Sequence, residues 1–416
     1  MDNLTHSLIG LAVGELVQRS LAPEPDHERQ STRRGLLLFA CWVASNFPDL
    51  DLFLTPLISA PLGYLLHHRG HTHTLLYAIP QAFLLWAMLW LCWPSARKLL
   101  SESGSARMGL VVTVVLGLVL HLLMDYLNSY GIHPFHPFDS RWLYGDMVFI
   151  LEPVFWIAFG MPLLMTLRRT GLKALIAGLM LGVLVFFTIR GFLLWPSLIA
   201  LVLLAIAIVA LQRTSDSRGK SALITGIVLS MGFVGMQGLA SNQAKLSVAQ
   251  MLQAQAPASE VLDASMSAFP TNPFCWSFVS IERDDAAGTY ALRRGVLSLA
   301  PAVLPVAGCP ASLAEGVSQA QGTTAIVFVS QEQGNLESLR KMKNENCHFE
   351  AWLRFARAPS LNETEASDSR FGSSMVKNFS SFNFADFKNR ECSRFIPGWD
   401  FPRADLLAPA AAGLQP

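Results

Sequence analysis

Charged residues are scarce in this sequence. Asp, Glu, Lys and Arg make up 15% of the 416 residues and hydrophobic residues 52%, whereas a soluble globular protein carries roughly 25% charged residues. Acidic and basic residues nearly cancel, to a net charge of +1, so no basic field favours DNA or RNA, and we expect no nucleic acid partner. More than half of the charged residues follow residue 242. The composition therefore predicts a membrane part followed by a water-exposed part.

Cysteine is also rare, with six in the chain. Cys41 and Cys92 lie in apolar stretches, and the other four lie in the more polar C-terminal part: Cys275, Cys309, Cys347 and Cys392. An even number in one segment suits an oxidising compartment, so we expect one or two disulfides there. The alternative is a set of buried, unpaired thiols.

Long apolar runs dominate the first 240 residues. A run of about 20 residues crosses roughly 30 Å of hydrocarbon, and six runs have about this length: residues 75–93, 108–127, 148–167, 172–189, 192–211 and 221–240. Two shorter runs, residues 4–17 and 35–47, precede them and predict a helical hairpin that enters the membrane and returns.

Basic residues concentrate in every second loop between these runs. The link between the two short runs holds four arginines, while the intervening loops are poor in basic residues and contain Arg69, Arg141 and Arg190. Basic loops stay in the cytoplasm. The N-terminus, these three loops and everything after residue 240 are therefore predicted to lie outside the cytoplasm.

The C-terminal part shows the alternation typical of strands. Residues 276–282 and 290–299 predict a β-hairpin, and residues 323–330 and 348–357 predict two further strands. The segment contains one histidine, His348, and no recognisable catalytic cluster. Residues 404–416 have the composition of a disordered tail.

These observations predict a mainly α, polytopic membrane protein. An N-terminal helical hairpin and about six transmembrane helices would precede a small β-rich or α+β extracytoplasmic domain. The expected parts are a metal-site membrane domain over residues 1–170, additional transmembrane helices over 171–241, and the extracytoplasmic domain over 242–416.

Histidine and aspartate residues from distant segments gather at the predicted outer face. Most of the ten histidines lie between His6 and His136. The candidate metal ligands are spread over four segments: His6, Asp49, Asp51, His68, His73, His121 and Asp125. Imidazoles and carboxylates suit Zn, Mn or Fe, and we expect one or two divalent ions, most simply Zn. For any single histidine, a packing role is the alternative.

The spacing of two pairs supports this assignment. His121 and Asp125 are separated by four residues on a predicted helix, so that their side chains share one face. Ionisable residues inside a membrane helix are costly and usually functional. Asp49 and Asp51 follow Pro48 and would direct both carboxylates to one side of an extended segment, where one binds metal and the other acts as base. His68 and His73 flank a turn that contains Gly70.

A second group of candidates follows His121 in the outward loop. Asp146 and Glu152 are candidate catalytic residues, as ligands, as a base or as hydrogen-bond partners of the ligating imidazoles. Arg69 and Arg141 are candidates for binding a substrate phosphate with both guanidinium nitrogens. The alternative for these arginines is simple contact with lipid headgroups.

These motifs resemble a known family. Residues 1–7, 46–51, 68–74, 121–131 and 142–153 are similar to the bacterial membrane-bound metal-dependent hydrolases, the inner-membrane proteins of the YdjM type. The resemblance covers about residues 1–170. It implies the seven metal ligands named above with Asp146 and Glu152 close by, a bacterial inner-membrane location and a hydrolase activity. His67 and His71 do not belong to the pattern.

A fainter resemblance is to zinc-dependent phospholipase C and the related helical single-strand nucleases. Those enzymes also order an N-terminal His, an Asp, a His and a His-x-x-x-Asp along helices. Those enzymes have a late His-x-x-x-Glu, whereas His136 and Glu152 are far apart in this chain. They also use an N-terminal Trp as a ligand, where this chain has Met1. The likeness implies a phosphodiester as a candidate substrate class.

The sequence thus predicts a hydrolase in which a metal-activated water attacks a phosphodiester or another ester at the outer membrane face. A lipid or lipid-linked substrate is expected because the site lies at the bilayer boundary. Two other functions stay open. One is a divalent-metal transporter, whose ligands should lie near the bilayer midplane, and the other is a non-enzymatic scaffold with a structural metal closed by four protein ligands.

Overall fold

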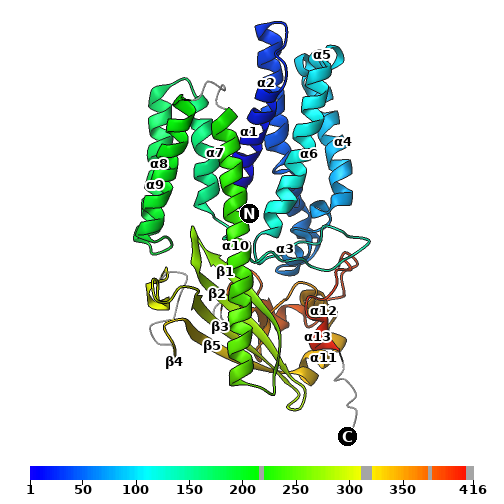
Figure 1. The fold of residues 1–416 in the computed structure, drawn as a ribbon. Coiled ribbons are helices and arrows are strands. Elements are labelled where there is room, and N and C mark those ends of the chain that lie inside the picture. The colour runs from blue at the N-terminus through cyan, green and yellow to red at the C-terminus, as the bar shows by residue number, and fades with distance from the viewer. Residues whose placement is uncertain (215–219, 311–320, 373–376, 409–416) are drawn as a thin grey trace.

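A helical bundle stands above a β-rich domain in the computed structural model, which describes residues 1–214, 220–310, 321–372 and 377–408 (Figure 1). The N-terminus lies at the junction between the two parts, and the described C-terminal residues lie in the β-rich part (Figure 1). The predicted architecture, a polytopic helical membrane part followed by a small β-rich domain, is confirmed.

The predicted N-terminal hairpin consists of α1 (Asn3–Ser20) and α2 (His27–Ala44). Asp2 caps α1 by accepting a hydrogen bond from the Thr5 backbone N–H over 3.0 Å, which satisfies one of the free donors of the first turn. The chain continues from α2 into a 3₁₀ helix, η1 (Phe47–Leu57). The Asp49–Asp51 segment is therefore helical, and the prediction that it is extended was wrong.

Six segments among the described residues are long and apolar enough to cross a membrane. They comprise α2 with η1 and five single helices: α4 (Leu75–Cys92), α6 (Gly104–Tyr126), α8 (Thr170–Ile189), α9 (Trp195–Thr214) and α10 (Lys220–Gln255). The predicted span 148–167 is instead the 14-residue helix α7 (Pro153–Thr166), because residues 148–152 form a loop before Pro153. The short helices α3 (Leu62–His67), η2 (His71–His73) and α5 (Pro94–Glu102) complete this part.

Helix α10 connects the membrane part to the sheet. Its 36 residues extend about 54 Å at 1.5 Å per residue, far more than the bilayer requires. Ala244, Val248 and Leu252 near its end are buried against Met266 and Trp276 of the sheet. The second half of α10 therefore belongs to the core of the C-terminal part.

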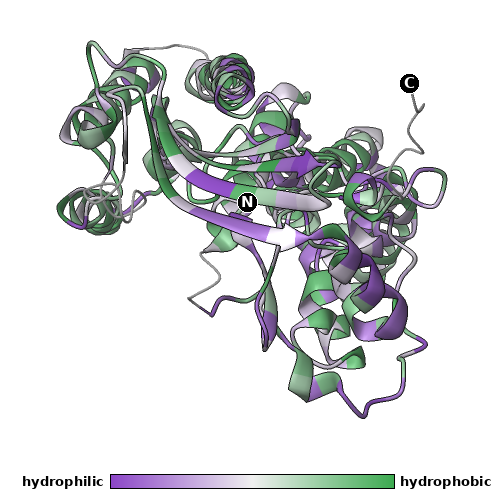
Figure 2. Ribbon diagram, turned by 90° about the horizontal axis from the view of Figure 1, so that it is seen from below, coloured by the Kyte–Doolittle hydropathy of each residue, from purple (hydrophilic) through white to green (hydrophobic). Residues whose placement is uncertain are grey.

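Five antiparallel strands form the main sheet, in the order β1-β2-β3-β5-β4. Their bounds are β1 (Glu260–Phe269), β2 (Asn272–Asp284), β3 (Thr289–Ser298), β4 (Gln321–Gly322) and β5 (Ile326–Asn335). The predicted hairpin is β2–β3, and the strand predicted at 323–330 corresponds to β5. Figure 2 shows hydrophilic and hydrophobic residues along these strands. Both faces of β2 are covered in part, because Phe278 is buried in the cluster that contains α10 and the adjacent Val279 in the cluster that contains α3 and α12 (Cys347–Leu353).

The remaining C-terminal elements are short. They are α11 (Leu336–Glu345), α12 (Cys347–Leu353), a small sheet of β6 (Pro359–Leu361), β7 (Glu365–Asp368) and β8 (Phe382–Asn383), the 3₁₀ helices η3 (Val306–Gly308), η6 (Ser369–Phe371) and η7 (Phe384–Phe387), and α13 (Ala404–Leu407). The strand predicted at 348–357 is wrong, because Asn346 caps α12 by accepting from the His348 and Phe349 backbone N–H groups. The start of the predicted disordered tail is helical in α13, and residues 409–416 lie outside the described residues.

Two disulfides join the four C-terminal cysteines, Cys275 with Cys309 and Cys347 with Cys392.

One hydrophobic cluster contains buried residues of both the C-terminal part and the membrane part. Leu62, Leu65 and Leu66 of α3 are fully buried in the cluster that contains Trp352 and Trp399. The Trp399 indole also donates to the Leu66 carbonyl over 2.9 Å, so the two parts are packed as one unit at this junction.

Candidate metal centre

Four buried side chains from three elements meet at the junction. Asp49 of η1, His73 of η2, and His121 and Asp125 of α6 each offer one ligand atom, and these atoms all lie within 4.8 Å of one another. We call these four residues the central group. The i, i+4 spacing of His121 and Asp125 on α6 puts the His121 Nε2 atom 3.6 Å from the Asp125 Oδ2 atom.

The Nδ1 atom of each imidazole in the central group contacts a residue outside that group. The His121 Nδ1–H donates to the Ser45 carbonyl over 2.7 Å, which leaves Nε2 facing the group, 3.0 Å from the His73 Nε2 atom. The His73 Nδ1 atom lies 3.1 Å from the Asp51 Oδ2 atom, and its Nε2 lies 3.4 Å from Asp49. Such contacts at the second ring nitrogen orient imidazoles that bind metal and fix the tautomer.

A second group adjoins the first and shares Asp49 with it. Asp49, Asp51 and His68 also offer three ligand atoms within 4.8 Å of one another. The His68 Nδ1 atom lies 3.1 Å from the Asp51 Oδ1 atom, and the Thr72 hydroxyl donates to Asp51 Oδ2 over 2.8 Å. The arrangement offers places for one or two ions, with Asp49 between them.

Asp125 divides its two oxygens between different partners. Oδ2 faces His73 at 3.2 Å, while Oδ1 accepts from the Met1 amine and lies 3.3 Å from the His6 Nε2 atom. His6 is fully buried and stacks on the His121 ring with 4.0 Å between centroids. It therefore lies beside the central group without being one of its four members.

Arg69 also lies beside Asp125. Its Nη2 atom is 3.0 Å from Asp125 Oδ1, and its Nη1–H donates to the Asp125 carbonyl and to Asn128 Oδ1. The Arg69 backbone has a φ of 57°, in the left-handed region that costs a residue with a Cβ roughly 1–2 kcal/mol. The Arg69 guanidinium is therefore paired with protein groups, and it holds the Asp125 carboxylate in place.

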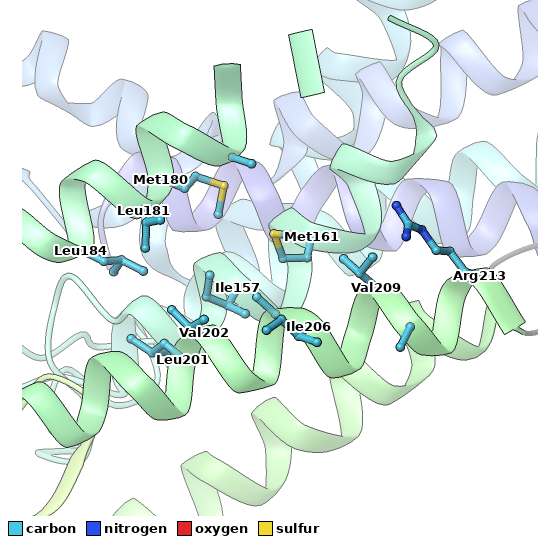
Figure 3. A pocket seen from close by; sticks show the side chains of 13 residues that line it. Ile157, Met161, Met180, Leu181, Leu184, Leu201, Val202, Ile206, Val209 and Arg213 are labelled. Carbon is cyan, nitrogen blue, oxygen red and sulfur yellow. The ribbon is translucent and has the colours of Figure 1, made fainter. Parts of the chain in front are cut away.

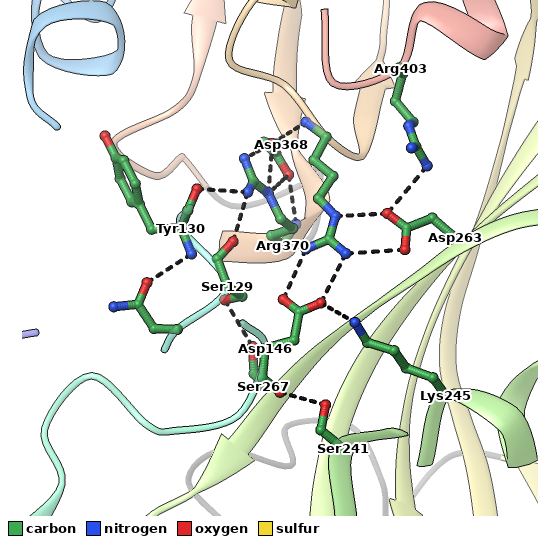
Figure 4. Close-up of polar contacts among 12 residues, drawn as sticks. Ser129, Tyr130, Asp146, Ser241, Lys245, Asp263, Ser267, Asp368, Arg370 and Arg403 are labelled. Atoms are coloured by element: carbon green, nitrogen blue, oxygen red, sulfur yellow. Dashed lines mark hydrogen bonds and ion pairs between the residues drawn. The ribbon is translucent and has the colours of Figure 1, made fainter. Parts of the chain in front are cut away.

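Asp146, a predicted catalytic residue, lies at the junction between the two parts of the chain (Figure 4). Its carboxylate pairs with both terminal nitrogens of Arg357 at 2.9 Å and with Lys245 at 2.7 Å. Arg357 also pairs with Asp263 at 2.7 Å. Burial alone would lower the pKa of Arg357, but the Asp146 and Asp263 carboxylates outweigh it and hold this pKa well above its usual value.

Glu152 and Arg141 likewise have their partners away from the central group. Glu152 is fully buried and accepts from the Thr271 N–H and hydroxyl at the β1–β2 turn, and from the Val154 N–H at the start of α7. Burial raises the pKa of Glu152 to about 7, although these hydrogen bonds oppose the shift. Arg141 is largely exposed and pairs with Asp139.

The other histidines of this region gather around Trp399 of the C-terminal part. The rings of His71, His133 and His136 lie 4.7, 3.9 and 4.7 Å from the Trp399 ring. With His67 they belong to neither of the two ligand groups. Sequence reasoning missed the supporting contacts of Ser45 and Thr72, because a backbone carbonyl and a lone hydroxyl leave no pattern in a sequence.

The donor set fits a divalent transition metal. Two imidazole nitrogens and two carboxylate oxygens suit Zn, Mn or Fe, and the net negative charge of the two aspartates suits a cation. All four residues are nine-tenths or more buried, so the His/Asp group is enclosed. Together with the six candidate membrane spans, the structure describes a multi-pass membrane protein with this group at the end of its helices.

Comparison with known proteins supports this class. Residues 1–196 match the family described as YdjM inner membrane protein, so this N-terminal part of the chain is similar to that family. A 158-residue stretch, 38% of this chain, is 26% identical to the uncharacterized protein YfhP of Bacillus subtilis (strain 168) and covers 44% of that protein. The chain therefore matches less than half of this relative. No solved structure matches.

Proposed function

We propose that this protein is a metal-dependent hydrolase of the inner membrane, with one or two divalent ions bound by the central group and its neighbours. The observation that carries the proposal is the pair of adjoining ligand groups that share Asp49. The ligands are His73, His121, Asp49 and Asp125, joined by Asp51 and His68 where a second ion binds. A bound metal ion of this kind lowers the pKa of water and polarises an ester or phosphodiester.

Residues around the ligands orient them, and a carboxylate accepts the proton of the water. Ser45 and Asp51 orient the imidazoles of His121 and His73, and Arg69 holds the Asp125 carboxylate. Asp49 has some solvent exposure, 9%, and Asp51 already accepts from Thr72. Where one ion is bound, one oxygen of Asp49 holds it and the other is free, so we assign the role of proton acceptor to that second oxygen before Asp51. Asp146, Glu152 and Arg141 have structural partners, and we give them no part in the reaction.

The site and the C-terminal part are proposed to face the outside of the cytoplasm. The opposite ends of the helices and the segments that join them carry Arg29, Arg97, Arg168 and Arg213, as expected of the cytoplasmic side. The two disulfides suit an oxidising compartment. A periplasmic reporter enzyme fused after Gln255 should be active, and the same reporter fused after Ser103 should be inactive. The reverse result would contradict this orientation.

A structural metal site is the second candidate, because the central group already supplies the four protein ligands of a closed site. Transport is disfavoured, because the ligands collect at one end of the helices rather than along a path through the bilayer. A structural ion would leave Asp51 and His68 without a role in binding, so two ions per chain would contradict this alternative, and with one ion per chain the hydrolysis assay decides between the two.

The first test is the metal content of the detergent-purified protein, measured by elemental mass spectrometry. We expect near-stoichiometric or twofold metal in the wild type and its loss in His73→Ala and His121→Ala. His71→Ala is the matched control, since this neighbouring histidine lies outside both groups, and it should keep its metal. Folded wild type that takes up no metal after resupply would overturn the proposal.

The second test is hydrolysis of membrane phospholipids by the metal-loaded protein in proteoliposomes, followed by mass spectrometry of the released products. We expect turnover by the wild type and at least a hundredfold less by Asp49→Asn, which removes the carboxylate shared by both groups. No product release by the metal-loaded wild type would favour the structural alternative, and equal release by the two proteins would show that Asp49 takes no part in hydrolysis.

A further inference from the structure

A cavity of about 310 Å³ lies between the membrane part and the C-terminal part. Its walls come from both parts and are largely aromatic and aliphatic, with Tyr64, Tyr130, Val148, Ile150, Phe371 and Phe379 among them. Ligand pockets in proteins have volumes of roughly 300–1,000 Å³ and few polar groups. This cavity is large enough for the ester region of a lipid and a few methylene groups.

The cavity borders the candidate metal centre. The Tyr64 ring lies 5.0 Å from the His68 ring, and the Tyr130 ring lies 5.9 Å from it. The Arg69 guanidinium, which holds Asp125, stacks over Tyr130 at 4.7 Å. Two side chains of the cavity wall therefore contact the ligand His68 directly.

Two buried hydrogen-bond donors in the cavity wall lack a partner among the described residues. They are the Tyr130 hydroxyl and the Asn128 side-chain NH₂ group, and the two residues are 7% and 5% exposed. The orientation of the Asn128 amide is fixed, because its Oδ1 already accepts from Arg69 and from the Tyr130 backbone N–H. Figure 4 shows the Tyr130 hydroxyl pointing away from the network around Arg370. Buried donors without a partner cost stability unless a ligand or water satisfies them.

Apolar side chains lie exposed at the edge of the cavity. Ile150, just before α7, and Phe379 are 42% and 43% exposed. Residues 148–152 form the loop at the start of an apolar helix, so this edge lies at the level where the helices leave the bilayer. An amphipathic molecule in the membrane could enter here without crossing an aqueous gap.

Other hollows in the described part of the protein lack this combination. The cavity of about 430 Å³ in Figure 3 is lined by aliphatic side chains of α7, α8 and α9, with Arg213 at one end, and it contains no residue of the metal centre. It is the kind of groove that lipid tails fill around any membrane protein.

We propose that the cavity between the two parts binds a lipid through an ester or phosphodiester group, with the oxygen of that group accepting hydrogen bonds from Tyr130 and Asn128. The apolar portion lies against Phe371 and Phe379, and the polar group faces His68. This inference rests on the proposed function and names the substrate class of that site. Tyr130 and Asn128 are binding residues in this scheme, and the C-terminal part completes the substrate site.

The test uses the full chain in proteoliposomes that contain a phosphatidylglycerol with a photoreactive diazirine near the carbonyl end of one acyl chain. The metal is first removed with a chelator, so that the lipid binds without turnover. After illumination, mass spectrometry should locate cross-links in residues 128–130 and 267–268. Cross-links confined to the outer faces of α4, α8 and α9 would overturn the proposal.

Substitutions give the quantitative test. Tyr130→Phe should lower the cross-link yield about five- to tenfold while leaving the thermal midpoint of unfolding unchanged or higher, because the hydroxyl loses no protein partner. Tyr144→Phe is the matched control: this buried hydroxyl also lacks a partner among the described residues, but Tyr144 does not line the cavity, so the yield should stay at the wild-type level. An equal yield in Tyr130→Phe would contradict the inference.

A filling substitution checks the place of binding. Ala268→Trp should remove the cross-links, whereas Ala177→Trp, which fills the cavity of Figure 3, should not. Where Ala268→Trp does not fold, Tyr130→Phe decides. Metal content separates the two proposals, because bound metal without lipid in the cavity contradicts only this inference. Lipid in the cavity of a protein that never binds metal contradicts only the hydrolase.

Discussion

At the scale of single residues, the centre depends on groups behind the metal ligands. His73 uses both ring nitrogens, with Nδ1 on Asp51 and Nε2 facing Asp49 and Asp125. A carboxylate behind a metal-bound imidazole fixes the ring and raises its basicity as a ligand. Asp51 serves His73 in this way and also approaches His68, so one side chain supports both groups.

Asp51→Asn should therefore weaken metal binding without unfolding the protein. The amide keeps an oxygen for the Thr72 hydroxyl but loses the charge that faces two imidazoles, and loss of such a partner typically costs about 10- to 100-fold in affinity. Competition between the protein and a chelator of known affinity measures this change. Asp139→Asn, at an exposed aspartate paired with Arg141, is the control and should bind metal like the wild type. Unchanged affinity in Asp51→Asn would contradict this role.

The sequence predicted the closeness of His121 and Asp125 but not the partners of the other candidates. Spacing alone predicts that His121 and Asp125 share a helix face, and the structure places them together. The candidates Asp146 and Glu152 had equally suitable chemistry, but their partners, Arg357 and Thr271, lie 211 and 119 residues further along the chain. Pairing at such separations is decided by the tertiary fold, which no local pattern records.

At the scale of elements, close packing of α2 and α6 positions the centre. A Cβ atom added to Gly117 would lie 2.6 Å from the Ala44 Cβ atom and 3.0 Å from the Cys41 carbonyl. Gly117 lies one turn before His121 on α6, and Ala44 immediately precedes Ser45. The glycine therefore allows the helix approach through which the His121 Nδ1–H reaches the Ser45 carbonyl.

Gly117→Ala should push α6 away from α2 and break this hydrogen bond. Overpacking of this kind costs about 1–3 kcal/mol, and we expect a lower thermal midpoint together with reduced metal content. Gly178→Ala on α8 is the control, because no described atom lies within 4 Å of a Cβ built there and alanine favours helix over glycine. Full metal occupancy in Gly117→Ala would show that the contact does not position His121.

Element boundaries followed the hydrophobic pattern where the pattern was long. The runs at 75–93 and 108–127 correspond to α4 and α6, because a membrane helix needs an uninterrupted apolar length. The segment 348–357 is too short for periodicity to separate helix from strand, and the cap at Asn346 made it helical. In the segment 148–167, Pro153 at the first position of α7 set the start of the helix.

At the scale of the whole molecule, buried ion pairs connect the two parts of the chain. Arg357 of the C-terminal part lies between Asp146 of the membrane part and Asp263 of β1, and its guanidinium stacks on Tyr144 at 4.0 Å. Arg370 adds hydrogen bonds to the Ser129 and Tyr130 carbonyls. The same contacts hold the walls of the cavity together, so docking of the C-terminal part and the shape of the proposed substrate site are linked.

Arg357→Met should loosen this docking, because it leaves the buried Asp146 carboxylate with only Lys245 as its partner. Breaking a buried pair from one side costs about 3–5 kcal/mol, and we expect a lower thermal midpoint and faster proteolysis between α10 and β1. The double variant Asp146→Asn/Arg357→Met should recover much of this loss, since it removes both charges of the broken pair, with metal content at the wild-type level throughout. Arg141→Met, at an exposed pair, should change neither the thermal midpoint nor the rate of proteolysis.

If Asp146→Asn alone abolished hydrolysis while the thermal midpoint and metal content stayed unchanged, Asp146 would act in the reaction, as its position in the sequence first indicated. Its ion pair with Arg357 would then have to open during turnover.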